Sequence, residues 1–174
     1  MRGATTTAPR REIGRLQTAV DRLEAQGYVH VDRATLREVE PWLRWSPALC
    51  ATVMAVGTIL ASPWILWGLI PFAALGAASS RQPFDYVYNH TVRRLTGTEP
   101  LPPHGAPRRF ACALASVWLV ATGAAFAADL DLLGYVLGGS LTAVAATVGT
   151  THFCIPSLIF GLLFGRPCRV AESA

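Results

Sequence analysis

The stretch FACALASVWLVATGAAFAA, residues 110–128, decides the fold of this chain because it contains no charged side chain. A helix rises about 1.5 Å per residue, so about 20 apolar residues cross the hydrocarbon core of a bilayer. Two further stretches, residues 46–80 and 130–164, are similarly apolar, and Asp131 is the one Asp, Glu, Lys or Arg residue in them. A water-soluble protein of 174 residues has no core large enough for three such stretches. The sequence therefore predicts an all-α membrane protein.

The three apolar stretches divide into four predicted transmembrane helices. Ser62 and Pro63 divide the first stretch, because serine is a favourable N-cap and proline a favourable first helical residue. The next helix covers residues 109–128. The last stretch, residues 130–164, is too long for one straight crossing, and Pro156 interrupts helical hydrogen bonding within it. We therefore expect a polytopic protein with four transmembrane helices, the last one broken near Pro156.

Amphipathic helices are predicted outside the membrane. The chain divides into a cytoplasmic amphipathic segment (1–45), a membrane domain (46–165) with a cytoplasmic loop (80–108), and a short cytoplasmic tail (166–174). The first segment carries an apolar stripe at helical spacing, which is a candidate surface for docking a partner protein: Ile13, Leu16, Val20 and Leu23. The loop carries a second set at helical spacing, which predicts a helix lying on the membrane surface: Phe84, Val87, Tyr88, Thr91 and Leu95.

The arginines predict the orientation of the chain in the membrane. All 15 basic residues are arginines, and they lie before residue 46, between 80 and 109, and after 165. Four crossings place these three regions on one side of the bilayer, which the positive-inside rule makes the cytoplasmic side. The turns on the other side contain no arginine. Five arginines are expected to contact lipid headgroups: Arg44, Arg93, Arg94, Arg108 and Arg109.

Cysteines form the one candidate chemical site. The predicted topology places Cys50, Cys112 and Cys154 at cytoplasmic helix ends, at a similar depth, with His152 nearby. Thiolates and an imidazole suit a soft metal such as copper or zinc, or a persulfide relay. The alternative interpretation is that these cysteines are small apolar residues that the cytoplasm keeps reduced. For His152, the alternatives are a ligand or proton carrier and a solvated residue at the interface.

Several classes of protein are excluded by missing motifs. The sequence has no phosphate-binding glycine loop, no zinc-protease motif and no hydrolase nucleophile motif. Its basic segments lack the interleaved aromatic residues typical of nucleic-acid binding, so no nucleic-acid partner is expected. A small transporter is disfavoured because no acidic or basic residue lies in the middle of a predicted crossing.

Three stretches together resemble a known family. PFDYVYNHTVRRLTG (83–97), PLPPHGAPRRFAC (100–112) and HFC (152–154) are similar to an uncharacterised bacterial membrane family, catalogued as domain of unknown function 4395. The resemblance covers roughly residues 40–165 and implies a bacterial membrane protein without an assigned activity. Members of that family often carry a second cysteine three residues after the first. Here Ser157 stands at that position, so the resemblance implies no dithiol disulfide at Cys154.

These observations predict a small integral protein of the bacterial inner membrane with both termini in the cytoplasm. We expect a non-enzymatic accessory or partner-docking subunit, in contact with the lipid bilayer and with a protein partner or a second copy of itself. The alternative is a thiol-based sulfur relay or a soft-metal site centred on Cys154, and the second alternative is a small transporter. No cofactor is expected.

Overall fold

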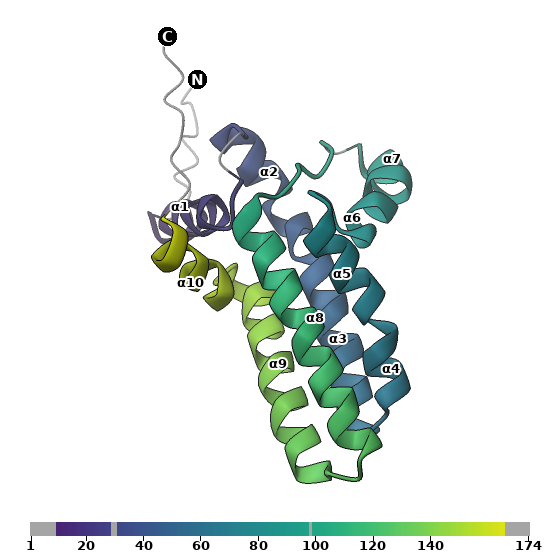
Figure 1. The fold of residues 1–174 in the computed structure, drawn as a ribbon. Coiled ribbons are helices and arrows are strands. Elements are labelled where there is room, and N and C mark those ends of the chain that lie inside the picture. Colours follow the sequence, from purple (N-terminus) through teal and green to yellow (C-terminus); the bar gives the residue numbers. More distant parts are fainter. Residues whose placement is uncertain (1–9, 29–30, 98, 166–174) are drawn as a thin grey trace, which may run out of the picture.

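Four rods of helix lie side by side in the computed structural model, which describes residues 10–28, 31–97 and 99–165 (Figure 1). The rods are α3 (Trp45–Ile59), α4 and α5 together (Pro63–Gly68 and Ile70–Ala78), α8 (Ala106–Ala127) and α9 (Asp131–Thr151). α3 packs on α9, α4 and α5 pack on α8, and α8 packs on α9. The turn between α3 and α4 and the turn between α8 and α9 lie at the same end of this bundle (Figure 1).

Two of these helices are long and apolar enough to cross a membrane: α8 and α9. Both expose large apolar side chains on their outer faces, among them Val117 on α8 and Val136 on α9. Such surface is unfavourable in water and favourable against lipid tails. A third crossing is counted only if Pro63–Ala78 and Pro83–Leu95, which meet at 82°, form one broken span. The described part of the chain is thus all-helical, with two or three candidate membrane crossings, and the predicted count of four is not confirmed.

Small residues bring the helices of the bundle close together. A methyl group built on Gly138 of α9 would lie 2.4 Å from Thr58 Oγ1 of α3, and one on Gly123 of α8 would lie 2.2 Å from Trp67 Nε1 of α4. Neither distance is possible for a real side chain. Glycine at these two places therefore permits the close contact, as in many helix pairs of membrane proteins.

The predicted break in the last apolar stretch is confirmed. α9 ends at Thr151, and α10 (Ile155–Phe164) begins a new direction, with Pro156 in its first turn. His152 takes the left-handed conformation at φ 56° and ends α9. A proline ring clashes with the carbonyl four residues earlier, which is that of His152, so the chain leaves the helix at this residue. α10 then packs against α8 through Phe110 and Phe160, whose ring centres are 5.7 Å apart.

The remaining elements gather at the end of the bundle opposite the two turns (Figure 1). They are α1 (Arg10–Ala25), α2 (Arg33–Leu43), α6 (Pro83–Val87), a π-helical turn (Tyr88–Val92) and α7 (Arg93–Thr96). An apolar cluster joins α1 and α2 to the loop between α5 and α8: Val20, Leu23, Tyr28, Leu36, Val39, Leu43, Tyr88 and Leu101. The N-terminal helices and this loop therefore form one small core of their own.

This core corrects the prediction of a free docking stripe. Val20 and Leu23 are at most 1% exposed, so their side chains are covered by the protein itself. The physical reason is that α2 supplies a matching apolar face, which α1 buries within its own chain. The side chains of Ile13 and Leu16, and the tail at 166–174 with Cys168, lie outside the described residues.

The predicted single apolar face in the central loop is also corrected. Tyr88 is fully buried, whereas Val87 is 56% and Leu95 88% exposed. Val87 and Tyr88 differ because successive helical residues point about 100° apart. The π-helical turn that follows Val87 widens the helix and rotates Leu95 relative to a regular α-helix.

Candidate functional site

A cavity of about 140 Å³ lies among the helices of the bundle, and Gln26, which follows α1, lines it as well. Its inner part is apolar and includes Met54, Leu119 and Leu141. Its other end is polar, with Gln26, Gln82 and Arg108. Leu141 and Val148 both line it, and seven residues of helix cover about 10 Å, so the cavity is long and narrow along α9. The site is therefore amphipathic, with an apolar channel that ends at a cationic side chain.

The structure brings the three predicted cysteines to this cavity. Cys50 comes from α3, Cys112 from the second turn of α8, and Cys154 stands immediately before α10. All three are free thiols, and Cys112 and Cys154 are each 8% exposed. Gln82 donates its Nε2 hydrogen to Cys112 Sγ at 3.1 Å. α3, α8 and the connection between α9 and α10 thus contribute one thiol each to the lining of the cavity.

His152 does not join these thiols. Its ring does not line the cavity, and Nε2 lies 2.9 Å from Glu40 Oε1. Within residues 10–28, 31–97 and 99–165, no group of three or more His, Cys, Asp or Glu side chains could hold a metal ion. The described structure therefore does not bring the four residues proposed for copper or zinc together around one point, because the His152 ring contacts Glu40 of α2 whereas the three thiols line the cavity.

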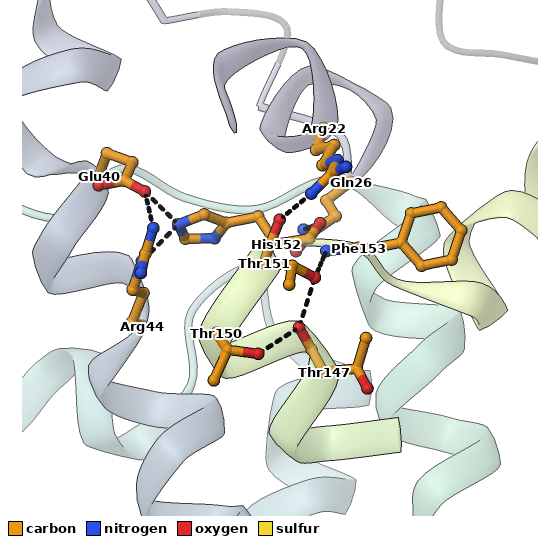
Figure 2. Close-up of polar contacts among 9 residues, drawn as sticks. All are labelled: Arg22, Gln26, Glu40, Arg44, Thr147, Thr150, Thr151, His152 and Phe153. Carbon is orange, nitrogen blue, oxygen red and sulfur yellow. Dashed lines mark hydrogen bonds and ion pairs between the residues drawn. The ribbon is translucent and has the colours of Figure 1, made fainter. Parts of the chain in front are cut away.

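His152 is also not the solvated interface residue that we considered. It is 2% exposed and lies in a network with Glu40 and Arg44, which Figure 2 shows. His152 Nε2 cannot at once accept a hydrogen bond from Arg44 Nε, which lies 3.2 Å away, and donate one to Glu40. The Glu40 carboxylate only accepts, so Nε2–H donates to Glu40, and Arg44 is held by its own contact with Glu40. Burial lowers the pKa of His152, so the ring is neutral near pH 7.

The turn at His152 ties the N-terminal helix to the bundle (Figure 2). Gln26 donates from Nε2 to the His152 carbonyl at 2.7 Å, and Arg22 donates to the Thr151 carbonyl at 2.7 Å. These carbonyls end α9 and have no partner within the helix. Because Gln26 also lines the cavity, this contact holds one wall of the polar end in place.

Arg108 is the charged group of the site. It is 6% exposed, although it was expected at the lipid headgroups, and Nη1 donates to the Tyr28 hydroxyl at 2.5 Å. Burial raises the pKa of Tyr28 to about 12, so this hydroxyl stays neutral. No carboxylate of the described residues forms an ion pair with Arg108. A guanidinium charge is therefore buried without a counterion in contact.

The other four arginines of that prediction divide into two groups. Arg93, Arg94 and Arg109 are exposed, and Arg109 donates to the carbonyls of Ala77 and Ala78 at the end of α5. Arg44 is partly exposed and is shared with the Glu40 network. Headgroup contact thus stays a prediction for these four and is corrected for Arg108, which the N-terminal helices cover.

A second buried histidine, His104, should make the stability of the protein depend on pH. His104 is 3% exposed, and burial, assisted by the charge of Arg108, lowers its pKa from 6.5 to about 4. Below pH 6.5 the unfolded chain binds a proton that the folded chain refuses, so the free energy of unfolding falls between pH 6.5 and about 4. We expect thermal unfolding in mild detergent to show this loss, and His104→Asn to reduce it.

The exposed His90 provides the matched control for this prediction. His90→Asn should leave the pH profile of the wild type unchanged. Some dependence remains in His104→Asn, because His152 contributes with the same sign. A His104→Asn profile identical to that of the wild type would contradict this assignment.

Comparison with known proteins gives one match. Residues 40–164 match the family described as "Domain of unknown function (DUF4395)". The matched region contains Arg108, the three cavity cysteines and the Glu40–His152 pair, whereas Gln26 and Tyr28 precede it. No curated protein and no solved structure matches the chain.

Proposed function

Since the chain belongs to the family of the domain of unknown function DUF4395, whose description assigns no activity, we propose its function from the cavity. The protein is a non-enzymatic module of the membrane that binds a small apolar or amphiphilic molecule at the level of the lipid headgroups. The observation that carries this proposal is a long apolar cavity of about 140 Å³ that ends at polar side chains. An engineered apolar cavity of about 150 Å³ in another protein binds benzene, so this volume is sufficient for a ligand.

The proposed setting is the inner membrane of a bacterium, crossed four times. α3 and the α4–α5 rod lie parallel to α8 and α9, and both turns of the bundle share one end (Figure 1). The arginines of the described residues lie at the opposite end or beside it, which favours a cytoplasmic location for that end and for both termini. In this setting the polar end of the cavity faces the cytoplasm and the channel reaches into the bilayer.

An accessory role fits a protein with a binding site and without a recognisable set of catalytic groups. The ligand would be presented to a protein partner or to a second copy of the chain. Arg94 is exposed at the cytoplasmic end, whereas Val20 and Leu23 are buried. We therefore place the proposed partner contact at this end and not on the buried stripe.

The test of the proposed function fills the cavity. Ala145 lines it, and its neighbour Ala146 is exposed on the same helix. We expect the wild type and Ala146→Phe, purified in mild detergent, to retain a small molecule that mass spectrometry detects. Ala145→Phe should lose it, because the ring occupies the channel. Absence of any bound molecule from all three proteins, or its equal retention in all three, would contradict the proposal.

A second candidate function is favoured by the three thiols that line the cavity. In a sulfur relay, the thiolate of one cysteine would attack the outer sulfur of a persulfide on another. The acceptor becomes the persulfide and the donor leaves as a thiolate, so no oxidant is needed. To test it, the protein is first reduced and then incubated with a low-molecular-weight persulfide, and its mass is measured. A gain of one sulfur that disappears in Cys154→Ser supports this candidate, and an unchanged mass rejects it.

A further inference from the structure

We infer that the cavity takes a single-chain amphiphile with a compact anionic head, and that Arg108 binds this head. The inference rests on the proposed function and adds the chemical class of the ligand. Its basis is the combination of a buried cation, a wall without acidic residues, and a channel too narrow for two chains.

The buried guanidinium of Arg108 has more hydrogen-bond donors than partners. Arginine carries five N–H donors, and in the described part of the chain one hydrogen bond is found for Arg108, to the neutral Tyr28 hydroxyl. Tyr28 also lies beneath the guanidinium, 5.7 Å from ring centre to Cζ. A charge removed from water is costly unless it is paired. A carboxylate, phosphate or sulfate in the cavity would supply the missing charge and accept two parallel hydrogen bonds.

The wall around Arg108 is suited to an anion. Among the described residues that line the cavity, none is Asp or Glu. The polar ones besides Arg108 and the thiols are Gln26 and Gln82, whose amide groups carry no charge. A cationic ligand would meet an arginine and no counterion. An anionic ligand would meet an arginine that can pair with it and no carboxylate that repels it. The lining of the cavity therefore favours an anionic ligand over a cationic one.

The apolar channel specifies the rest of the ligand. It extends about 10 Å along α9 from Val148 to Leu141 and is bordered by Met54, Leu119 and Trp118. A volume of about 140 Å³ over this length accommodates one slender chain. A phospholipid with two chains would not fit inside, so the ligand is a molecule with one chain.

Asp85 provides an internal competitor for the head. It is 3% exposed, and its charge acts on Arg108 without an ion pair between them. Burial raises the pKa of the Asp85 carboxyl, while Arg108 opposes this rise. Whenever Asp85 is ionised, it offsets part of the charge that attracts the ligand. Removal of this carboxylate charge should therefore strengthen anion binding.

The experiment measures binding to the full chain in nanodiscs of phosphatidylcholine, with empty nanodiscs as the baseline. Three probes separate the features of the ligand: n-octyl phosphate, n-octanol and inorganic phosphate. We expect n-octyl phosphate to bind about tenfold or more tightly than n-octanol, because only the phosphate pairs with Arg108. Inorganic phosphate should bind more weakly than n-octyl phosphate, since it lacks the chain.

Two matched variants assign the effect to Arg108. Arg108→Gln should remove the preference for n-octyl phosphate over n-octanol. Arg109→Gln should keep it, because Arg109 is exposed and not part of the cavity wall. If Arg108→Gln does not fold, Asp85→Asn serves instead, because it keeps the oxygen that caps α6. It should bind n-octyl phosphate more tightly than the wild type and n-octanol equally.

The outcomes distinguish this inference from the proposed function. Equal binding of n-octyl phosphate and n-octanol by the wild type would overturn the inference and leave the apolar site intact. Inorganic phosphate binding as tightly as n-octyl phosphate would overturn the role of the chain and indicate a site for free anions. Binding of none of the three would overturn both. An Asp85→Asn variant with unchanged affinity for n-octyl phosphate, at a pH where Asp85 of the wild type is ionised, would contradict the role of Arg108.

Discussion

Gly27→Ala is expected to lower the free energy of unfolding by about 3 kcal/mol, because it combines backbone strain with a collision. Gly27 has a φ of +99°, which side chains rarely tolerate. A methyl group there would lie 2.7 Å from the Gly105 Cα, and backbone cannot rotate away as a side chain can. The contact joins the end of α1 to the connector before α8. Its loss should therefore loosen the N-terminal helices from the bundle, and Tyr28 from Arg108.

The variant Gly97→Ala separates the cost of backbone strain from the cost of the collision. The φ of Gly97 is +68°, but a methyl group on it would meet nothing within 4 Å. Gly97→Ala should therefore carry the backbone cost alone, about 1–2 kcal/mol. Denaturant unfolding of both variants in the same mild detergent gives the comparison. Equal losses in the two variants would mean that the contact between Gly27 and Gly105 contributes nothing to stability.

Glu40→Ala should lower the free energy of unfolding by about 2–3 kcal/mol, since it leaves the neutral His152 ring buried without an acceptor. Glu40 is 5% exposed and holds both His152 and Arg44. Glu40→Gln should recover part of the loss, because an amide oxygen still accepts from Nε2. The measurement is denaturant unfolding at pH 7.5, where the pKa lowered by burial keeps His152 neutral.

Glu38 is the matched control for this second prediction. It lies on the same helix, two residues earlier, and is exposed. Glu38→Ala should change the free energy of unfolding by no more than about 0.5 kcal/mol. If Glu40→Ala and Glu38→Ala behave alike, the network between α2 and the end of α9 does not stabilise the fold.

The helices of the bundle could be predicted from the sequence because they are long and continuous. The apolar stretch that became α8 requires no partner to be recognised, and the break at Pro156 follows from the chemistry of proline. The common location of Cys50, Cys112 and Cys154 could also be predicted, since helices that alternate in direction return to the same depth. The position of a residue relative to the ends of its helix thus predicts which residues of neighbouring helices lie at the same level.

The partners of the polar residues could not be predicted in this way. Glu40 and His152 are 112 positions apart, and no local pattern joins them. A signal was present in α2, where Glu40 lies four residues after Leu36 on the buried face. An acid at such a position indicates a buried partner, but not which one. The adjacent Arg108 and Arg109 differ completely in exposure, because successive helical residues point about 100° apart.

The region before residue 40 covers part of the candidate site, although it lies outside the family match. The family match covers residues 40–164 and includes Arg108 and the thiols, whereas Gln26 and Tyr28 come from the segment before it. This segment covers Arg108 and contributes one wall to the polar end of the cavity. The described structure therefore combines a site within the family region with a cover that lies outside it.

A crystal structure of the wild-type protein tests whether the cavity binds a single-chain anionic amphiphile. The crystals are grown from a lipidic phase, and molecules that remain bound to the purified protein are not removed. We expect one elongated density in the cavity, with its head within hydrogen-bonding distance of the Arg108 guanidinium and its chain directed towards Leu141. A cavity without such density, with Arg108 paired to Asp85 and the bundle closed around it, would contradict this binding mode.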